Sequence, residues 1–332
     1  MRAMAVVATF PWTVEFLPVE APEPSDDDVV IRVTQSWISS GTEGSFIRGE
    51  RIAGDTPRMQ FDPPPFPHVP GYQKVGIVEW VGSRVAHVRP GDRVFATVSH
   101  VQGMFFDTGG HISPAVTHGS QVWKIPEGVE PLAVSGLVLT QVGYNCGVRP
   151  AMAAGDAAVV IGDGLVGHWA AQTLAWRGAR VMLVGRHADR IGRFHRREQD
   201  GVVNSREEDP VSAAEAWAPD GLQVIVDTVG SIEAMENLYP ITRRAGALVS
   251  AGFYGFMGQI DIQKMRDREL TLHAPSGWTG PRLDATLRLI ASGDLQTLPL
   301  ITHHFPANDA PQAYDLILNR QAPVLGVVLD WE

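Results

Sequence analysis

Residues 155–186 contain the feature that most constrains the fold. An apolar run leads into Gly162-Asp163-Gly164-Leu165-Val166-Gly167, followed by an apolar-periodic segment and a second apolar run. This order predicts a strand, a glycine-rich turn, a helix that begins near Leu165 and Val166, and a second strand. Gly162 permits the tight turn, Gly164 lets a pyrophosphate approach the backbone, and Gly167 lets the helix pack close to the strand. The stretch therefore predicts a dinucleotide-binding unit.

The end of the second strand indicates which dinucleotide is bound. Enzymes that use NAD usually carry Asp or Glu about 20 residues after the glycine motif, where it binds the ribose 2′-hydroxyl. Here Gly185 and Arg186 follow the strand, without a carboxylate, and a guanidinium can bind a 2′-phosphate through two hydrogen bonds. We expect NADPH (NADP+) as the cofactor. Arg190 and Arg193 either extend this basic patch or form an ordinary solvated helix face.

The composition excludes several classes of protein. A chain of 332 residues is long enough for two domains, and a net charge of -10 argues against general binding to nucleic acid or to a membrane surface. The opening segment is interrupted too early by Pro11 to be a signal peptide or a transmembrane helix. The single cysteine, Cys146, fits a reducing cytoplasm. We expect a cytoplasmic protein whose partners are small molecules and copies of itself.

Two architectures follow one another along the chain. Strand patterns at residues 4–16, 29–37, 72–85 and 93–98 predict a small antiparallel β-barrel, and a helix is expected over 131–147. Beyond Arg186, helices and strands alternate, which predicts a doubly wound parallel sheet in an α/β protein. The predicted helices and strands, in chain order, are helix 189–198, a short strand near Val202, helix 210–217, strand 224–227, helix 231–239, strand 246–253, strand 270–273, helix 281–292, strand 301–305, helix 308–319 and strand 324–329.

Three residues at two strand ends in this α/β region are candidate cofactor contacts. Asp227, Gly252 and Phe253 follow strands at the carboxyl edge of the predicted sheet, where such sheets bind their ligands. They either touch the cofactor or serve only as turn residues.

The chain resembles the medium-chain dehydrogenase/reductase superfamily over essentially its whole length. The matching motifs are Ser40-Gly41-Thr42-Glu43, Pro70-Gly71-Tyr72-Gln73-Lys74-Val75-Gly76, Gly91-Asp92-Arg93-Val94, the glycine-rich motif and Ile301-Thr302-His303 through Ala313-Tyr314. The resemblance implies a GroES-like β-barrel catalytic domain at 1–130, a Rossmann NADP-binding domain at 131–280, and a C-terminal return to the catalytic domain at 281–332. The Ser-Gly-Thr-Glu motif is similar to that of a subgroup that includes bacteriochlorophyllide dehydrogenases.

The zinc ligands of related alcohol dehydrogenases are missing from the matching positions. Ser40 stands where those enzymes have a ligand cysteine, and Tyr72 and Gln73 stand where they have His and Glu. Catalytic zinc needs three good nitrogen, sulfur or oxygen ligands and an open position. We expect no catalytic zinc, and Cys146 alone excludes the four-cysteine structural zinc site of the family.

Without a metal, hydride transfer to a carbonyl needs another group to stabilise or protonate the developing oxyanion. Tyr72 is the candidate proton donor if a cation such as Lys74 lowers the pKa of its phenol, and the alternative is that it fills the space left by zinc. Ser40 and Gln73 are candidate hydrogen-bonding groups at the same site. Thr140 resembles the family threonine beside the nicotinamide, with Gln141 as the alternative.

The sequence leaves three functions open. We expect a zinc-independent, NADPH-linked oxidoreductase that acts on a carbonyl or secondary alcohol, and family members join as dimers, so a homodimer is expected. The alternatives are an NADPH-dependent enoyl or quinone-type C=C reductase and a non-catalytic NADPH-binding protein. Five aromatic residues either line a cleft for a ring-containing substrate or belong to the core: Trp37, Phe46, Phe61, Phe66 and Trp278.

Overall fold

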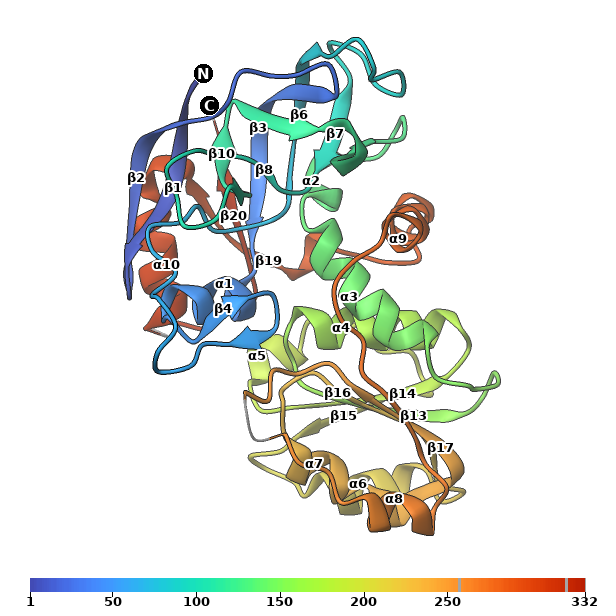
Figure 1. The fold of residues 1–332 in the computed structure, drawn as a ribbon. Helices are drawn as coiled ribbons and strands as arrows, with labels where there is room; N and C mark the ends of the chain where they lie inside the picture. Colours follow the sequence, from blue (N-terminus) through green and yellow to red (C-terminus); the bar gives the residue numbers. More distant parts are fainter. Residues whose placement is uncertain (256–257, 320–321, 332) are drawn as a thin grey trace. The chain divides into compact units, whose positions relative to one another are not determined.

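The computed structural model describes residues 1–255, 258–319 and 322–331, which form two compact units (Figure 1). The first unit consists of residues 1–138 and 297–332, and the second consists of residues 139–296. The predicted boundaries at 130/131 and 280/281 differ from these divisions by 8 residues (138 − 130) and 16 residues (296 − 280).

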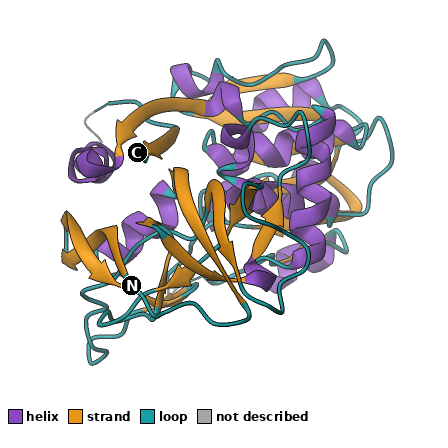
Figure 2. Cartoon of the chain, turned by 90° about the horizontal axis from the view of Figure 1, so that it is seen from above, coloured by secondary structure: helices purple, strands orange, loops and turns teal. Residues whose placement is uncertain are grey.

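The first unit opens with a hairpin rather than with one long strand. Strands β1 (Arg2–Phe10) and β2 (Thr13–Glu20) pair antiparallel, and the short β10 (Ile112–Ser113) pairs with the other edge of β1. The predicted strand over 4–16 is interrupted because the chain turns at Pro11 and Trp12, where Trp12 has a φ of 64°. In Figure 2 the N-terminus lies among orange strands and teal loops.

A larger sheet carries the C-terminal segment back into the first unit. Its order is β12-β7-β6-β3-β20-β19, and β11 pairs with β3 beside this path. Val328 of β20 faces Trp37 of β3 in an antiparallel register, so residues almost 300 positions apart are neighbours. Figure 1 shows the red β20 beside the blue β3. The strands are β3 (Asp28–Ile38), β6 (Lys74–Val81), β7 (Arg93–Ala96), β11 (Ala115–His118), β12 (Val122–Lys124), β19 (Ile301–Pro306) and β20 (Gly326–Asp330).

Short elements complete the first unit around an aliphatic core. Alternate residues of β3 point into that core, including Val29, Ile31 and Val33, which are fully buried. The remaining helices and strands of this unit are α1 (Ser40–Ile47), β4 (Arg51–Ala53), β5 (Thr56–Pro57), β8 (Ser99–His100), β9 (Thr108–Gly109), α2 (Pro131–Val134) and α10 (Ala310–Leu318).

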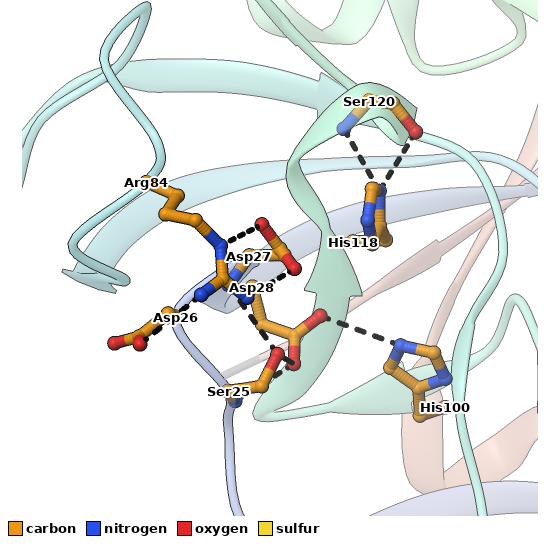
Figure 3. Close-up of polar contacts among 8 residues, drawn as sticks. All are labelled: Ser25, Asp26, Asp27, Asp28, Arg84, His100, His118 and Ser120. Carbon is orange, nitrogen blue, oxygen red and sulfur yellow. Dashed lines mark hydrogen bonds and ion pairs between the residues drawn. The ribbon is translucent and has the colours of Figure 1, made fainter.

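Ion pairs fix the start of β3 on the surface of the first unit (Figure 3). Arg84 donates from Nε to Asp27 at 2.7 Å and also contacts Asp26 at 3.3 Å. Asp28 is buried and lies 3.4 Å from the imidazole of His100. Burial raises the pKa of Asp28, but hydrogen bonds from Ser25 outweigh burial, so the net pKa is lowered.

The second unit is a six-stranded parallel sheet with the order β15-β14-β13-β16-β17-β18. The apolar runs predicted as strands become its central members, and all five residues of β13 are buried. The helices and strands are α3 (Leu137–Val148), β13 (Ala157–Ile161), α4 (Leu165–Trp176), β14 (Arg180–Gly185), α5 (Ala188–Ile191), β15 (Gly201–Asn204), α6 (Pro210–Trp217), β16 (Leu222–Asp227), α7 (Ile232–Glu236), β17 (Thr242–Ser250), α8 (Ile262–Asp267), β18 (Thr271–His273) and α9 (Gly280–Ser292).

Several predicted helices are shorter than expected, including the helix over 231–239, of which only Ile232–Glu236 is α-helical. The helix over 131–147 is broken at Ser135 and Gly136, where the chain passes so close to Trp37 that a Cβ on Gly136 would lie 2.8 Å from the indole. The helix over 189–198 ends at Ile191. Beyond it, Asp200 ties the chain back to the sheet by accepting a hydrogen bond from the backbone N–H of Val181 at 2.9 Å.

The helices of the described segments include none with both the length and the apolar character that a membrane span requires.

Candidate active site

The glycine-rich turn has the close backbone packing that its sequence predicts. Gly162 directly follows β13 and has a φ of 119°, in the left-handed region that favours glycine. A Cβ on Gly167 would overlap the carbonyl oxygen of Gly162, so α4 approaches the strand more closely than any other residue would allow. A Cβ on Gly164 would meet nothing within 4 Å, which leaves open space over the first turn of α4. This cradle fits a dinucleotide pyrophosphate against the helix N-terminus.

A carboxylate lies at the end of β14, where the sequence predicts none. Asp163 extends from the glycine-rich turn, and its Oδ2 accepts hydrogen bonds from the backbone N–H groups of Arg186 and His187, both at 2.8 Å. The Nδ1 of His187 lies 2.9 Å from the same oxygen. A spacing rule that inspects only the residues after the strand misses Asp163, because this residue comes 22 positions earlier in the chain than Gly185 (185 − 163).

Asp163 is charged in spite of its burial. Burial raises its pKa, but the two backbone N–H groups and the His187 ring outweigh burial and bring the pKa below the usual value. The carboxylate also explains Gly185, because a Cβ there would lie 2.6 Å from the Cβ of Asp163. The glycine-rich turn thus supplies the carboxylate, and the last residue of β14 is a glycine, which leaves space for the Asp163 side chain.

Two arginines flank this carboxylate in different ways. The Arg186 side chain is exposed, while the Arg190 side chain is half-buried with its Nη1 3.7 Å from Asp163 Oδ1. The Nε of Arg190 is buried and has no hydrogen-bond partner among the described residues. A 2′-phosphate bound here would meet guanidinium groups beside an internal carboxylate.

The other predicted cofactor contacts lie at the carboxyl edge of the same sheet. Asp227 ends β16, and its carboxylate accepts hydrogen bonds from three backbone N–H groups, at residues 229–231, and from the Tyr254 hydroxyl at 2.5 Å. Gly252 packs against the backbone of Gly230 so closely that a Cβ would overlap it. Asp227 and Gly252 therefore shape the loops, and their contact with a cofactor stays a prediction, as does that of Phe253.

Thr140 and Gln141 are both fully buried in the first turns of α3 rather than at its end. Gln141 donates from its amide to the carbonyl oxygen of Gly277 at 3.2 Å. Their place beside a nicotinamide also stays a prediction.

In the first unit, α1 brings Ser40 close to the candidate donor Tyr72. The Tyr72 hydroxyl donates to Ser39 Oγ at 2.7 Å, one residue before Ser40. Burial raises the pKa of Tyr72 to about 12, so the phenol keeps its proton at neutral pH. The Ser40 hydroxyl oxygen is buried and has no hydrogen-bond partner among the residues that the structure describes.

The predicted activation of Tyr72 by Lys74 is wrong. Lys74 is fully buried in β6, and its Nζ donates to the backbone carbonyl of Thr97 at 2.5 Å. Burial lowers the pKa of Lys74 to about 7, and the lysine is not among the groups that change the pKa of Tyr72. Gln73 is also buried, with its amide donating to the carbonyl of Trp37 at 3.2 Å. Both side chains are thus bonded to backbone carbonyls, whereas the Tyr72 hydroxyl is bonded to Ser39.

Glu43, which follows Ser39 in the sequence, belongs to a network of buried hydrogen bonds. The Ser40-Gly41-Thr42-Glu43 motif contains Glu43 but none of the other members of this network. Glu43 Oε1 accepts a hydrogen bond from the backbone N–H of Ser39 at 2.7 Å, which caps α1. Glu43 Oε2 lies 2.9 Å from His111 Nε2 and also accepts the hydroxyl of Tyr314. The carboxylate thus joins α1 to two segments that are remote in the sequence.

The network continues to the C-terminal strand. Trp331 donates from Nε1 to Ser36 Oγ at 2.8 Å, and Ser36 Oγ lies 2.8 Å from His111 Nδ1. Every donor has an acceptor if Ser36 donates its hydroxyl to Nδ1 and the Nε2–H of His111 points to Glu43. Gly71 allows this geometry, because a Cβ there would lie 2.5 Å from the His111 ring. No sequence spacing relates His111 to Glu43, so sequence reasoning missed it.

Aromatic rings surround a buried histidine near α1. His68 is 2% exposed, and its ring lies 6.2 Å from Phe46, 5.5 Å from Phe66 and 5.6 Å from Phe106. Its Nδ1 must donate to the carbonyl of Pro65 at 2.5 Å, so Nε2 is an acceptor, and Nε2 has no partner among the described residues. Phe46 and Phe66 therefore join one cluster, whereas Trp37 is a core residue, Phe61 is 94% exposed and Trp278 belongs to the second unit.

These side chains do not fit a catalytic zinc ion. A zinc site needs thiolate, imidazole or carboxylate ligands, but Ser40 and Gln73 offer neutral oxygen donors and Tyr72 keeps its proton. Within residues 1–255, 258–319 and 322–331, no three His, Cys, Asp or Glu side chains are placed to hold a metal ion together.

Two family models match separate parts of the chain. The alcohol dehydrogenase GroES-like domain matches residues 25–127, and the zinc-binding dehydrogenase model matches residues 166–291. The second description names a metal, but the donor set above does not fit one.

Similar proteins cover the whole chain. A 2-desacetyl-2-hydroxyethyl bacteriochlorophyllide A dehydrogenase from Cereibacter sphaeroides is 27% identical over 100% of this chain and 99% of that protein. Among solved structures, a dehydrogenase of unknown specificity from Escherichia coli has a TM-score of 0.87 at 20% identity over 100% of both chains. A Sinorhizobium meliloti protein assigned as a zinc-binding dehydrogenase and solved with NADP has a TM-score of 0.82 at 19% identity over 99% of both chains. With the GroES-like β domain, the Rossmann sheet and these two family models in agreement, the chain belongs to the medium-chain dehydrogenase/reductase superfamily of oxidoreductases.

Proposed function

We propose that the chain is an NADPH-linked oxidoreductase that transfers a hydride between the nicotinamide and a carbonyl or secondary alcohol. The observation that carries this proposal is the open glycine cradle at Gly162–Gly167, with the exposed guanidinium of Arg186 at the end of the neighbouring strand. The turn binds the pyrophosphate, and Arg186 pairs with the 2′-phosphate, assisted by Arg190.

Tyr72 is the proton donor of this proposal. The bound cofactor supplies the hydride. A phenol with a pKa of about 12 holds its proton at neutral pH and gives it to the more basic alkoxide that forms on the substrate. The Tyr72 hydroxyl donates to Ser39 Oγ at 2.7 Å, so in this proposal it turns away from Ser39 to give its proton to the substrate oxygen, to which Ser40 Oγ is a second donor.

The reaction proceeds without catalytic zinc in this proposal. Ser40, Tyr72 and Gln73 replace the family's metal ligands, and Gln73 is already engaged with a backbone carbonyl. Hydrogen-bond donors then do what a metal would otherwise do at the oxyanion.

The aromatic cluster of Phe46, Phe66, His68 and Phe106 supports a ring-containing substrate. The name of the Cereibacter sphaeroides relative points to a ring compound that bears a hydroxyethyl group, which accords with this substrate class.

Two other functions are kept as candidates. An NADPH-dependent enoyl or quinone-type reductase reduces an activated C=C bond by hydride addition, and the lack of zinc-ligating residues favours it. A non-catalytic NADPH-binding protein would use the same cradle, since fold does not fix function.

We also propose a cytoplasmic homodimer. The edge strand of the Rossmann sheet is β18, in which Leu272 is 37% exposed, and a second copy of the chain can extend the sheet there. The only cysteine, Cys146, is buried and free, in keeping with a reducing compartment. Light scattering after size exclusion tests the dimer, and a monomer would contradict it.

One screen tests the proposed function. Purified protein is assayed with NADPH against ketones, aldehydes and enones, and with NADP+ against secondary alcohols, while its zinc content is measured by mass spectrometry. We expect turnover of a carbonyl or alcohol with less than about one zinc per ten chains. Turnover of enones alone selects the C=C reductase, tight NADPH binding without any turnover selects the non-catalytic protein, and stoichiometric zinc contradicts the metal-free mechanism.

A Tyr72→Phe variant then tests the donor. We expect kcat to fall at least about 100-fold with little change in KM for NADPH, because only proton transfer is lost. Unchanged turnover removes Tyr72 from the mechanism.

A further inference from the structure

The cradle of N–H groups at the end of β14 already holds an anion. Asp163 Oδ2 is 2.8 Å from the backbone nitrogens of both Arg186 and His187, and the ring of His187 donates to the same carboxylate. The side chain is only 7% exposed. Successive backbone N–H groups of this kind are the donors that bind phosphate oxygens in many proteins.

The carboxylate occupies the volume that a side chain on the last residue of β14 would otherwise fill. Its Oδ2 would lie 2.7 Å from a Cβ built on Gly185. An acid at the end of this strand normally recognises the unphosphorylated ribose. In this chain the negative charge is present at the same place, although it comes from the glycine-rich turn.

Arg190 cannot act as an independent cation while Asp163 is charged. Its Nη1 lies 3.7 Å from Asp163 Oδ1, so part of its charge is balanced within the protein. Its Nε is buried without a hydrogen-bond partner among the described residues, and so this guanidinium keeps donor capacity that Asp163 does not use. A 2′-phosphate is therefore attracted by Arg186 and Arg190 and repelled by Asp163.

We propose that Asp163 is a specificity-determining residue that lowers the affinity of this site for a 2′-phosphate, so that the chain accepts NADH as well as NADPH. The inference rests on the proposed NADPH site. The negative charge of Asp163 weakens the binding of a 2′-phosphate, whereas the positive charge of Arg186 strengthens it. The effect of Asp163 comes from its charge and not from the shape of the turn.

The test measures binding of two adenosine fragments by isothermal titration calorimetry at neutral pH and low salt. The fragments are 2′,5′-ADP, which carries the 2′-phosphate, and 5′-AMP, which lacks it. Asp163→Asn keeps an oxygen that can accept from the two backbone N–H groups but removes the charge. We expect it to tighten 2′,5′-ADP about tenfold and to change 5′-AMP less than about twofold.

Two further variants make the result specific. Asp189→Asn removes the same charge from an exposed position on α5, and we expect it to change neither affinity by more than about twofold because water surrounds an exposed carboxylate and weakens its electrostatic interactions. Arg186→Ala should weaken 2′,5′-ADP about tenfold or more and leave 5′-AMP unchanged. If Asp163→Asn lowers the thermal midpoint, Asp163→Ser is used in its place, since its hydroxyl is also an acceptor.

The outcomes separate this inference from the proposed function. Unchanged or weaker 2′,5′-ADP binding in the Asp163 variants overturns the inference, while a loss in Arg186→Ala still supports the NADPH site. Equal tightening of both fragments also overturns it, since the charge would not act at the 2′ position. If wild-type protein binds 2′,5′-ADP no better than 5′-AMP and Arg186→Ala has no effect, the NADPH proposal fails, and a selective gain in Asp163→Asn still supports the role of Asp163.

Discussion

Glu43 and Asp163 are buried carboxylates, 2% and 6% exposed, that are held in opposite ways. Glu43 accepts hydrogen bonds from the side chains of His111 and Tyr314, which lie 68 and 271 residues away in the sequence. Asp163 accepts from two backbone N–H groups and a ring only 23 and 24 residues away.

The sequence distance to their hydrogen-bond donors indicates different roles for the two buried carboxylates. Glu43 connects α1, the loop before β10 and α10, so its loss disconnects segments of the first unit. Asp163 shapes one loop of the second unit, and the sheet below it is formed by apolar residues that do not depend on the carboxylate. We therefore expect Glu43 to govern stability and Asp163 to govern the charge of the binding site.

The largest expected effect is the loss of Glu43. Glu43→Ala leaves the His111 ring, the Tyr314 hydroxyl and the Ser39 N–H without a buried acceptor, and we expect the free energy of unfolding to fall by about 4 kcal/mol. Urea denaturation measures this change. As a control, Glu79→Ala removes a carboxylate from an exposed pair with Arg32 and should cost less than about 1 kcal/mol. Similar losses of unfolding free energy in Glu43→Ala and Glu79→Ala would contradict the expected role of Glu43 in stability.

The second effect is a dependence of the free energy of unfolding on pH. It comes from His168, whose pKa is influenced by Asp163, and not from Asp163 itself. His168 is fully buried in α4, where the backbone of Arg190 and the charge of Asp163 are the groups that favour its protonated ring. Burial lowers its pKa to about 4 from 6.5, although Asp163 opposes this shift. The neutral ring is favoured in the folded state, so stability is fully present above pH 6.5 and is lost as the pH falls toward 4.

The expected loss from His168 is about 3 kcal/mol between pH 7.5 and pH 4. His168→Leu keeps an apolar side chain of similar size and should remove this part of the pH dependence. The contributions of His68, whose pKa is lowered by burial, and of Asp28 and Asp163, whose pKa values are lowered by hydrogen bonds, remain. Thermal denaturation at several pH values measures both proteins. Parallel curves for wild type and variant would show that His168 is not the group responsible.

A smaller effect is expected for the stability of Asp163→Asn. The amide oxygen still accepts from the backbone N–H groups of Arg186 and His187, so the free energy of unfolding should fall by about 1 kcal/mol. Urea denaturation beside Glu43→Ala measures the contrast directly. A loss as large as that of Glu43→Ala would mean that Asp163 also holds the fold together.

The smallest effect is expected at the exposed ion pairs of Figure 3. Arg84→Ala breaks contacts with Asp26 and Asp27, all of whose side chains are at least 42% exposed. Water and salt replace such pairs at almost no cost. The denaturation midpoint should stay within experimental error of wild type, and a clear decrease would show that the start of β3 needs this clamp.

The sequence predicts most helices and strands of the second unit, because each of them is marked by a local pattern of residues. Apolar runs, the glycine motif and helix-forming segments each act over a few residues, and α6 has the predicted bounds of 210–217. Helix breaks are harder to predict, since Gly136 lies in such a break and its close approach to Trp37 involves residues about 100 positions apart. Asp163 escaped a spacing rule because its side chain reaches a strand end from another loop.

The candidate site of the first unit depends on pairs that no local pattern relates. Tyr72 could be chosen because it occupies a motif position, but the Ser39 partner and the raised pKa follow only from burial in the folded unit. The predicted role of Lys74 failed for the same reason, because the strand turns its side chain toward Thr97.

The hydrogen bond from Trp331 to Ser36 also has a consequence for synthesis on the ribosome. The second unit is one continuous segment, residues 139–296, and can fold as soon as it has left the exit tunnel. The first unit lacks β19, β20 and the Trp331 donor until residues 301–331 have been made, so one edge of β3 stays unpaired up to that point. A nascent chain stalled before residue 297 should therefore carry a folded second unit and an incomplete first unit that chaperones can reach.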